Sequence, residues 1–310
     1  KTFNSTDVNI KFLTGKSDIK EKKLIRKNLL NGKINFLIGT HALFQKNVFF
    51  KCLGLAIIDE QHRFGVMQRA SLREKGGTPH LLVMSATPIP RSLALTLYGD
   101  LDISVLDELP PGRQVVNTSR VEPRYRENTY AFVRRQIEQG RQAFVICPLI
   151  QESDVLQSRS AVQEFEKLSS EIFPDLRLKL LHGRMASKEK EDVMGSFYKH
   201  EVDILVATAV IEVGIDNPNA TVILIEGAER FGLAQLHQLR GRVGRSHHKA
   251  YAYLVIKSHQ SITENARKRL DAIASLEELG AGFMLANHDL EIRGAGDLLG
   301  EKQSGKISEI

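Results

Sequence analysis

The stretch Leu53-Gly-Leu-Ala-Ile-Ile-Asp59-Glu60 joins an unbroken apolar run to a pair of acids. A run that is apolar at every position is typical of a parallel strand covered on both faces. Ligands of open parallel sheets bind beyond the carboxyl ends of the strands, where this pair of acids stands. The stretch therefore predicts an α/β sheet that carries carboxylates at its functional edge.

Similar apolar runs recur along the chain, and amphipathic helical stretches separate them, which is the pattern of parallel βαβ units. The predicted strands are Ile10–Leu13, Phe36–Ile38, Leu53–Ile58, Leu81–Met84, Ala143–Cys147, Leu176–Leu181, Asp203–Ala207, Thr221–Ile225 and Ala250–Ile256. The predicted helices include Ile19–Leu30, Val162–Phe173 and Ser187–Tyr198. No internal sequence repeat is evident, so the two halves resemble one another only in this alternation.

A linker is predicted at Glu108-Leu-Pro-Pro-Gly-Arg113, because two prolines and a glycine interrupt helix and strand alike. We expect a partial α/β domain over residues 1–109 and a second α/β domain over residues 114–257. A helical hairpin followed by a glycine-rich loop is expected over residues 258–310.

Composition narrows the class of protein. The 310 residues carry a net charge of +6, which suits a polyanionic partner. Tryptophan is absent and aromatic residues make up 6%, so tracking of a nucleic-acid backbone is favoured over base stacking. The two cysteines form neither a zinc spacing nor a disulfide framework, and the apolar runs are far shorter than the ~20 residues of a membrane span. A cytoplasmic protein is expected.

The acids and two distant arginines suit phosphate chemistry. Asp59 is a candidate magnesium ligand, and Glu60 can orient an attacking water. Arg242 and Arg245 lie three residues apart beside Gly241 and Gly244, and guanidinium groups match phosphate oxygens. An ordinary strand-end acid pair and a basic helix end are the alternatives.

The string Gly15-Lys16-Ser17 resembles the end of a phosphate-binding P-loop. The full pattern requires a glycine at position 10, where the chain has Ile10. We therefore predict a strand-end turn at Thr14-Gly15. The chain then has the acids and the arginines without a phosphate cradle, so a catalytically incomplete module that binds DNA stays open as an alternative.

Further polar residues follow predicted strands, where hydroxyls, imidazoles and backbone amides suit contacts with nucleotide or sugar-phosphate, although ordinary turns explain each one equally well. These candidates are Thr40, His41, Ser85, Thr87, His182, Gly183, Thr208, Gly214 and Asp216. A metal-dependent nuclease is a remote further alternative, for which Asp216 would be the additional acid.

Taken in order, these strings resemble the superfamily 2 helicases and, among them, the RecG family of ATP-dependent DNA helicases. The resemblance covers nearly the whole chain. It rests on Ile38-Gly-Thr-His-Ala42, Asp59-Glu-Gln-His-Arg-Phe-Gly-Val66, Ser85-Ala-Thr-Pro-Ile-Pro-Arg91, Asp107-Glu-Leu-Pro-Pro-Gly-Arg113, Cys147-Pro-Leu-Ile150, Leu181-His-Gly-Arg-Met185, Ala207-Thr-Ala-Val-Ile-Glu-Val-Gly-Ile-Asp216 and Gln235-Leu-His-Gln-Leu-Arg-Gly-Arg-Val-Gly-Arg245.

The resemblance implies two RecA-like domains, the first of them incomplete, that use ATP and magnesium to move on double-stranded and branched DNA in repair and recombination. It implies that Asp59 and Glu60 serve magnesium and the catalytic water, that Gln61 and His62 couple the domains, and that the two arginines are arginine fingers. Gly214, Asp216 and Gln238 are expected to face the nucleotide. The resemblance also implies an upstream P-loop segment and an N-terminal wedge domain, so we expect the C-terminal part of a longer protein.

The tail resembles a sister family, the transcription-repair coupling factors. The similar strings are Leu279-Gly-Ala-Gly-Phe283 and His288-Asp-Leu-Glu-Ile-Arg-Gly-Ala-Gly-Asp297. Arg293 and Gln303 match positions of the translocation motif that both families share. A coupling translocase with RNA polymerase as a partner therefore stays open as an alternative.

Overall fold

The computed structural model describes residues 8–15, 17–45, 47–59, 79–85, 102–106, 108–109, 111–148, 154–208, 217–257, 262–275 and 288, with side chains of the helix at 154–167 from residue 161 onward. The chain divides into two compact units, residues 1–86 and 87–310. The predicted linker at residues 108–113 lies within the second unit, and its flanks are partly outside the described residues, so the predicted domain boundaries stay a prediction.

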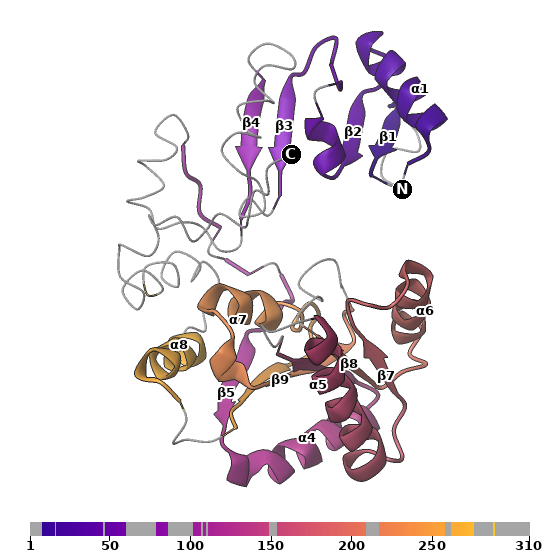
Figure 1. The fold of residues 1–310 in the computed structure, drawn as a ribbon. Coiled ribbons are helices and arrows are strands. Elements are labelled where there is room, and N and C mark those ends of the chain that lie inside the picture. The colour runs from indigo at the N-terminus through magenta and orange to yellow at the C-terminus, as the bar shows by residue number, and fades with distance from the viewer. Residues whose placement is uncertain are drawn as a thin grey trace. The chain divides into compact units, whose positions relative to one another are not determined.

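The first unit contains two pairs of parallel strands (Figure 1). Strands β1 and β2 pair with Leu13 opposite Gly39, and strands β3 and β4 pair with Ile58 opposite Val83. One face of helix α1 packs on the first pair through Ile25 and Leu29. The elements are β1 (Ile10–Leu13), α1 (Ile19–Leu30), β2 (Phe36–Gly39), the 3-10 turn η1 (His41–Phe44), β3 (Leu55–Ile58) and β4 (His80–Val83).

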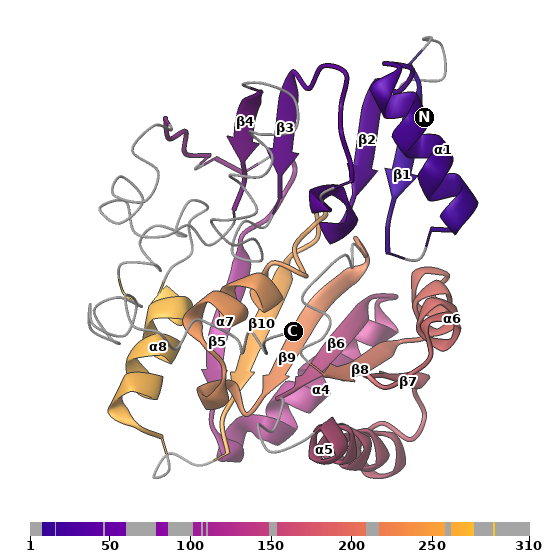
Figure 2. The ribbon, with the colours of Figure 1, turned by 45° about the horizontal axis from the view of Figure 1, so that its top comes forward.

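The second unit is built on a six-stranded parallel sheet in the order β5-β10-β9-β6-β8-β7 (Figure 2). Every residue of the inner strands β6, β8 and β9 is buried, which explains why their sequences are predominantly apolar. The strands are β5 (Val116–Val121), β6 (Gln142–Cys147), β7 (Leu178–Leu181), β8 (Ile204–Thr208), β9 (Ala220–Glu226) and β10 (Ala250–Val255).

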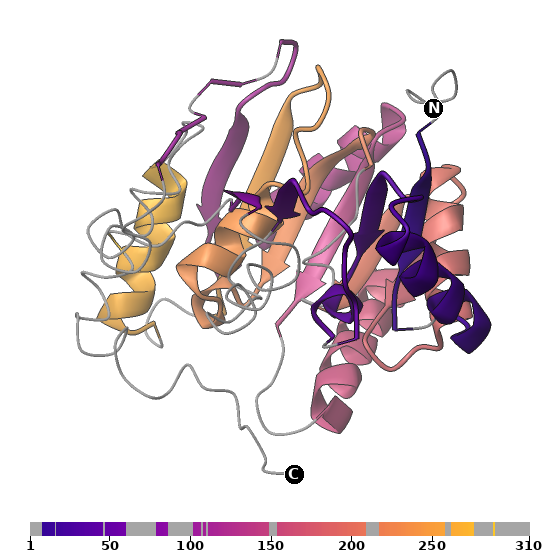
Figure 3. The ribbon, with the colours of Figure 1, turned by 90° about the horizontal axis from the view of Figure 1, so that it is seen from above.

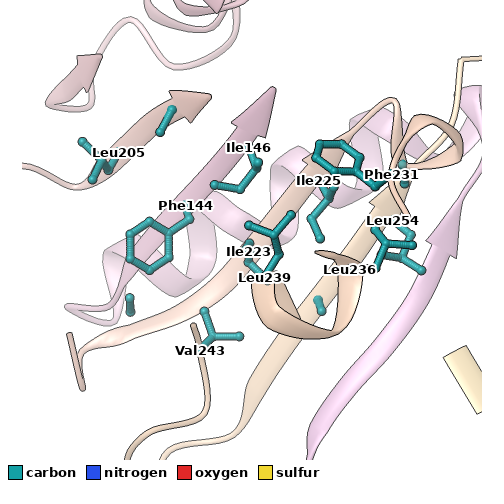
Figure 4. Close-up of a cluster of buried hydrophobic side chains, with 14 of the residues drawn as sticks. Phe144, Ile146, Leu205, Ile223, Ile225, Phe231, Leu236, Leu239, Val243 and Leu254 are labelled. Carbon is teal, nitrogen blue, oxygen red and sulfur yellow. The ribbon is translucent and has the colours of Figure 1, made fainter. Parts of the chain in front are cut away.

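Helices cover both faces of this sheet, as in doubly wound α/β folds (Figure 3). One face packs on α4 and α5, and the other packs on α6, α7 and α8. Figure 4 shows the second of these cores, where Phe144, Ile223 and Leu239 meet between the sheet and α7. The helices are α4 (Arg126–Glu138), α5 (Asp154–Lys167) with a π-turn at Leu168–Ile172, α6 (Ser187–Tyr198), α7 (Leu233–Arg240) and α8 (Glu264–Ser275).

The predicted fold class is confirmed, and the helices Ile19–Leu30 and Ser187–Tyr198 have the predicted bounds. Strand β5 was not among the predicted strands. Its sequence, Val-Asn-Thr-Ser-Arg-Val, is polar because β5 lies at the edge of the sheet and, among the described strands, pairs with β10 alone. Helix α5 begins at Asp154 and not at Val162, and its last turn widens into the π-turn. Among the described residues, no helix has the length and apolar character required to cross a membrane.

Candidate nucleotide and nucleic-acid site

The first unit places Asp59 and Ser85 at the same edge of a parallel pair. Asp59 directly follows β3, Ser85 lies two residues beyond the end of β4, and the Met84 amide donates to the Ile58 carbonyl at 2.8 Å. The two strands are therefore neighbours, which is the condition for the Ser85 hydroxyl group to lie beside the acid, and that placement stays a prediction. Asp59 is exposed, so its carboxylate suits a magnesium ion that keeps most of its water ligands.

The turn after β1 is a strand-end turn, as predicted. The Thr14 amide donates to Oγ of Ser17 at 3.1 Å, and the Ser17 amide donates back to the Thr14 carbonyl at 3.3 Å. Thr40 follows the neighbouring strand at the same edge, because Leu13 pairs with Gly39. Gly39 is required there, since a Cβ atom on it would lie 2.1 Å from the Leu13 carbonyl oxygen.

In the second unit, the two arginines lie in a tight turn after α7. Arg242 is buried, with 9% of its surface exposed, and its amide donates to the Leu239 carbonyl at 3.0 Å. Arg245 is half-buried, and its Nε donates to the Gly241 carbonyl at 3.0 Å, which fixes the direction of its guanidinium group. The turn therefore holds both guanidinium groups on a rigid backbone.

Gly244 determines the shape of this turn. Its φ of 73° is in the left-handed region, and a Cβ atom would lie 2.7 Å from Cγ2 of Val116. We expect Gly244→Ala to lower the free energy of unfolding by roughly 1–3 kcal/mol. Gly241→Ala is the matched control, because Gly241 has a φ of −67° and a Cβ atom there would make only ordinary contacts at 3.5 Å. Urea unfolding of both variants checks this, and equal losses of stability would contradict it.

Two further arginines hold the α7 turn in place, and sequence reasoning did not identify either of them. Nε of Arg113, from the predicted linker, donates to the Gly244 carbonyl at 3.0 Å. Arg240 is buried; it donates to the Ile273 carbonyl of α8 at 3.1 Å and lies 3.1 Å from Nδ1 of His237. Only the proximity of Arg240 to the predicted arginine fingers could have drawn attention to it.

Two polar atoms without a protein partner in the described part of the chain lie at the ends of β7 and β8. They are Nδ1 of His182 and Oγ1 of Thr208, and Thr208 is only 2% exposed. Because Leu181 pairs with Ala207, these two residues follow paired positions on neighbouring strands. Buried polar atoms are nearly always satisfied, so this edge is prepared for a polar ligand or for water.

Two buried groups of the second unit have displaced pKa values of opposite sense. Glu226, at the end of β9, pairs with Arg126 at 2.6 Å, but its burial raises the pKa of the carboxyl to about 7. Burial and the neighbouring Arg240 lower the pKa of His237 to about 4. His237 is therefore neutral near pH 7, while Glu226 titrates there.

These pKa values predict opposite pH dependences for two variants. The contribution of Glu226 to stability is full below its ordinary pKa of 4.5 and is lost as pH rises through about 7. The contribution of His237 to stability is complete above its ordinary pKa of 6.5 and is lost as pH falls through about 4. Relative to the parent chain, Glu226→Gln should therefore gain roughly 1–3 kcal/mol of unfolding free energy as pH rises across its window. His237→Gln should gain stability as pH falls, and urea unfolding at several pH values checks both slopes.

Of the remaining predicted site residues, the structure describes Gln238, Gly183 and the backbone of His41. Gln238 is described, on α7, and is half-buried. Gly183 is exposed in the turn between β7 and α6. The residues outside the described part of the chain are Glu60, Gln61, His62, Thr87, Gly214, Asp216, Arg293 and Gln303, together with the side chain of His41.

Comparison with known proteins identifies the class. Residues 1–96 match the DEAD/DEAH box helicase model, and residues 127–247 match the helicase conserved C-terminal domain model. The parallel α/β fold and these two matches place the chain among the superfamily 2 helicases.

The chain is 50% identical over 303 residues to the ATP-dependent DNA helicase RecG of Synechocystis sp., covering 98% of this chain and 36% of that protein. It is 50% identical to RecG of Thermotoga maritima, covering 98% of this chain and 38% of that protein. A structure of RecG bound to a three-way DNA junction matches with a TM-score of 0.71 and 47% identity, covering 96% of this chain and 38% of the other. The chain belongs to the RecG family, and it spans well under half the length of these relatives.

Proposed function

We propose that this chain is the motor region of an ATP-dependent translocase that remodels branched DNA, such as forks and Holliday junctions, in repair and recombination. The observation that supports this most strongly is the pair of predicted phosphate-facing groups, Asp59 at a strand end and Arg245 in a fixed turn, in a chain of the RecG family. Relatives are named ATP-dependent DNA helicases, and one was solved on a three-way junction.

In this proposal the two units share one nucleotide. Asp59 and Glu60 of the first unit would hold magnesium and orient the attacking water, while Arg242 and Arg245 of the second would neutralise the transferring phosphate. A bound magnesium ion would supply positive charge that offsets the charge of the phosphates. Gln61, His62, Gly214, Asp216 and Gln238 complete the proposed nucleotide site.

The DNA contacts are proposed for the strand-end turns. In the first unit the proposed DNA contacts are Thr14, Gly15 and Thr40. In the second unit they are His182, Gly183 and Thr208, and two buried polar atoms there lack a protein partner among the described residues. Ser85 and Thr87 would pass the state of the nucleotide to these turns. Arg293 and Gln303 belong to the proposed translocation motif, and the cytoplasm is the proposed compartment.

The test uses the full-length protein that contains this chain. ATP hydrolysis is measured without DNA, with linear duplex and with a forked duplex, and fork unwinding is followed by gel electrophoresis. We expect hydrolysis to depend on DNA and to be highest with the fork, together with strand separation that requires ATP. The proposal would be overturned by a rate of ATP hydrolysis that is the same with and without DNA. It would also be overturned by cleavage of the fork in the absence of ATP, which would indicate a different phosphate chemistry.

A further inference from the structure

The two units contain the same segment, 168 residues apart. Strand β1 begins at Ile10 and β7 at Leu178, α1 begins at Ile19 and α6 at Ser187, and β2 begins at Phe36 and β8 at Ile204. This repeat is not evident from the amino-acid sequence, because only eight of the 32 residue pairs between 9–40 and 177–208 are identical. These are Lys11, Leu13, Gly15, Lys20, Glu21, Lys22, Leu37 and Thr40, each with its counterpart.

The correspondence extends to backbone detail. Leu13 pairs with Gly39 in one unit, and Leu181 pairs with Ala207 in the other, at the same offset. After each helix the chain turns through a left-handed residue, Gly32 with a φ of 68° and His200 with a φ of 63°. His200 is the one positive-φ residue other than glycine among the described residues, so this turn is kept even where the side chain disfavours it.

One side-chain hydrogen bond is repeated as well. Nζ of Lys22, on α1, donates to the Gly15 carbonyl at 2.7 Å, and Nζ of Lys190, on α6, donates to the Gly183 carbonyl at 2.5 Å. Both lysines are half-buried, and both glycines lie in the turn after the first strand of the segment. A charged donor gives a stronger hydrogen bond than a neutral one, so each ammonium group holds the peptide plane of its turn.

Each copy of the segment also contains a second lysine that can serve as a matched control for the bonded one. Lys20 and Lys188 are identical in the two copies, two positions before the bonded lysines, and both are exposed. Neither is recorded in a hydrogen bond or ion pair within the described part of the chain. They supply the same charge to the same helix turn without a contact to the glycine. Charge alone therefore does not distinguish the half-buried lysines from their neighbours, whereas the bond to the carbonyl does.

We propose that Lys22 and Lys190 are positioning residues for DNA binding, one in each unit, which hold the strand-end glycine turn in the conformation that meets the sugar-phosphate backbone. This inference rests on the proposed function, in which Thr14-Gly15 and His182-Gly183 contact DNA. In the second copy, His182 and Thr208 stand beside the turn with buried polar atoms that lack a protein partner among the described residues. The lysine acts through the glycine carbonyl and is not itself a DNA contact.

The experiment measures binding of the full-length protein to a forked DNA duplex by fluorescence anisotropy at several salt concentrations. We expect Lys22→Met and Lys190→Met each to weaken binding about tenfold, equivalent to about 1.4 kcal/mol. The matched controls Lys20→Met and Lys188→Met remove the same charge and should weaken binding by no more than about threefold, as for a charge at the rim of a contact. Lys22→Arg and Lys190→Arg keep a charged donor and should restore most of the affinity.

The dependence on salt separates positioning from direct contact. Loss of a phosphate contact lowers the salt slope by about one, whereas loss of a positioning residue should leave the slope equal to that of its matched control. Methionine variants that bind like their controls, or arginine variants that bind no better than methionine, would overturn the inference. An unmodified protein that fails to bind the fork would overturn the proposed function itself. Thermal unfolding of each variant confirms that a loss of binding is not a loss of fold.

Discussion

Replacing Arg245 with alanine in the full-length protein should lower ATP turnover by about 10³-fold, at the lower end of the effect of an arginine finger. The loss should fall on turnover and not on DNA affinity, because the proposed partner of Arg245 is the transferring phosphate. The turn that holds it is fixed by Gly244 and by the bond from Nε of Arg245 to Gly241, so the guanidinium group is already oriented before the nucleotide binds.

The control for this variant is Arg267→Ala, which removes an exposed arginine from α8 of the same unit. It changes the net charge equally and should leave turnover within about twofold of the parent, as for most exposed charges. Steady-state hydrolysis with saturating forked DNA measures both variants. If Arg245→Ala retains turnover equal to that of Arg267→Ala, the residue has no role at the phosphate.

Asp59→Asn should have an effect of similar size from the other unit, about 10²–10³-fold on turnover, because an amide is a poorer magnesium ligand than a carboxylate. Asp59 is exposed at the end of β3, so the substitution buries no new polar group and the fold should be retained. The dependence of hydrolysis on magnesium concentration should shift to higher concentrations in the variant.

Asp102→Asn provides the comparison, because Asp102 is also an exposed acid in the described part of the chain. Its magnesium dependence should match that of the parent protein. Unchanged magnesium dependence in Asp59→Asn would show that the metal is held by other residues and would remove the strand-end acid from the mechanism.

The sheet could be predicted from the sequence because most of its strands are buried on both faces. Burial of this kind leaves a continuous apolar run, such as Ala143–Cys147, that is visible without a structure. Strand β5 shows the limit. As an edge strand it needs only half of its side chains to be apolar, so its polar sequence does not show the continuous apolar run by which the other strands are predicted.

The candidate site residues could be proposed from the sequence, but the contacts that position them could not. Arg242 and Arg245 are marked by neighbouring glycines, whereas the importance of Arg240 depends on a carbonyl of α8, 33 residues away. The repeated segment escaped notice for a similar reason. Hydrophobic positions such as Ile25 and Val193 exchange freely as long as the helix face stays buried, so only a few identities remain, among them the turn glycine and the bonded lysine.

In the proposed function, acids of one unit and arginines of the other act on one nucleotide. The most direct measurement compares the turnover of Asp59→Asn, Arg245→Ala and the double variant. Residues that act together on one phosphate are strongly non-additive, so the double variant should be no more than about threefold slower than the slower single variant. If the two losses multiply, giving a combined loss on the order of 10⁵-fold or more, the residues act independently and the shared site is contradicted.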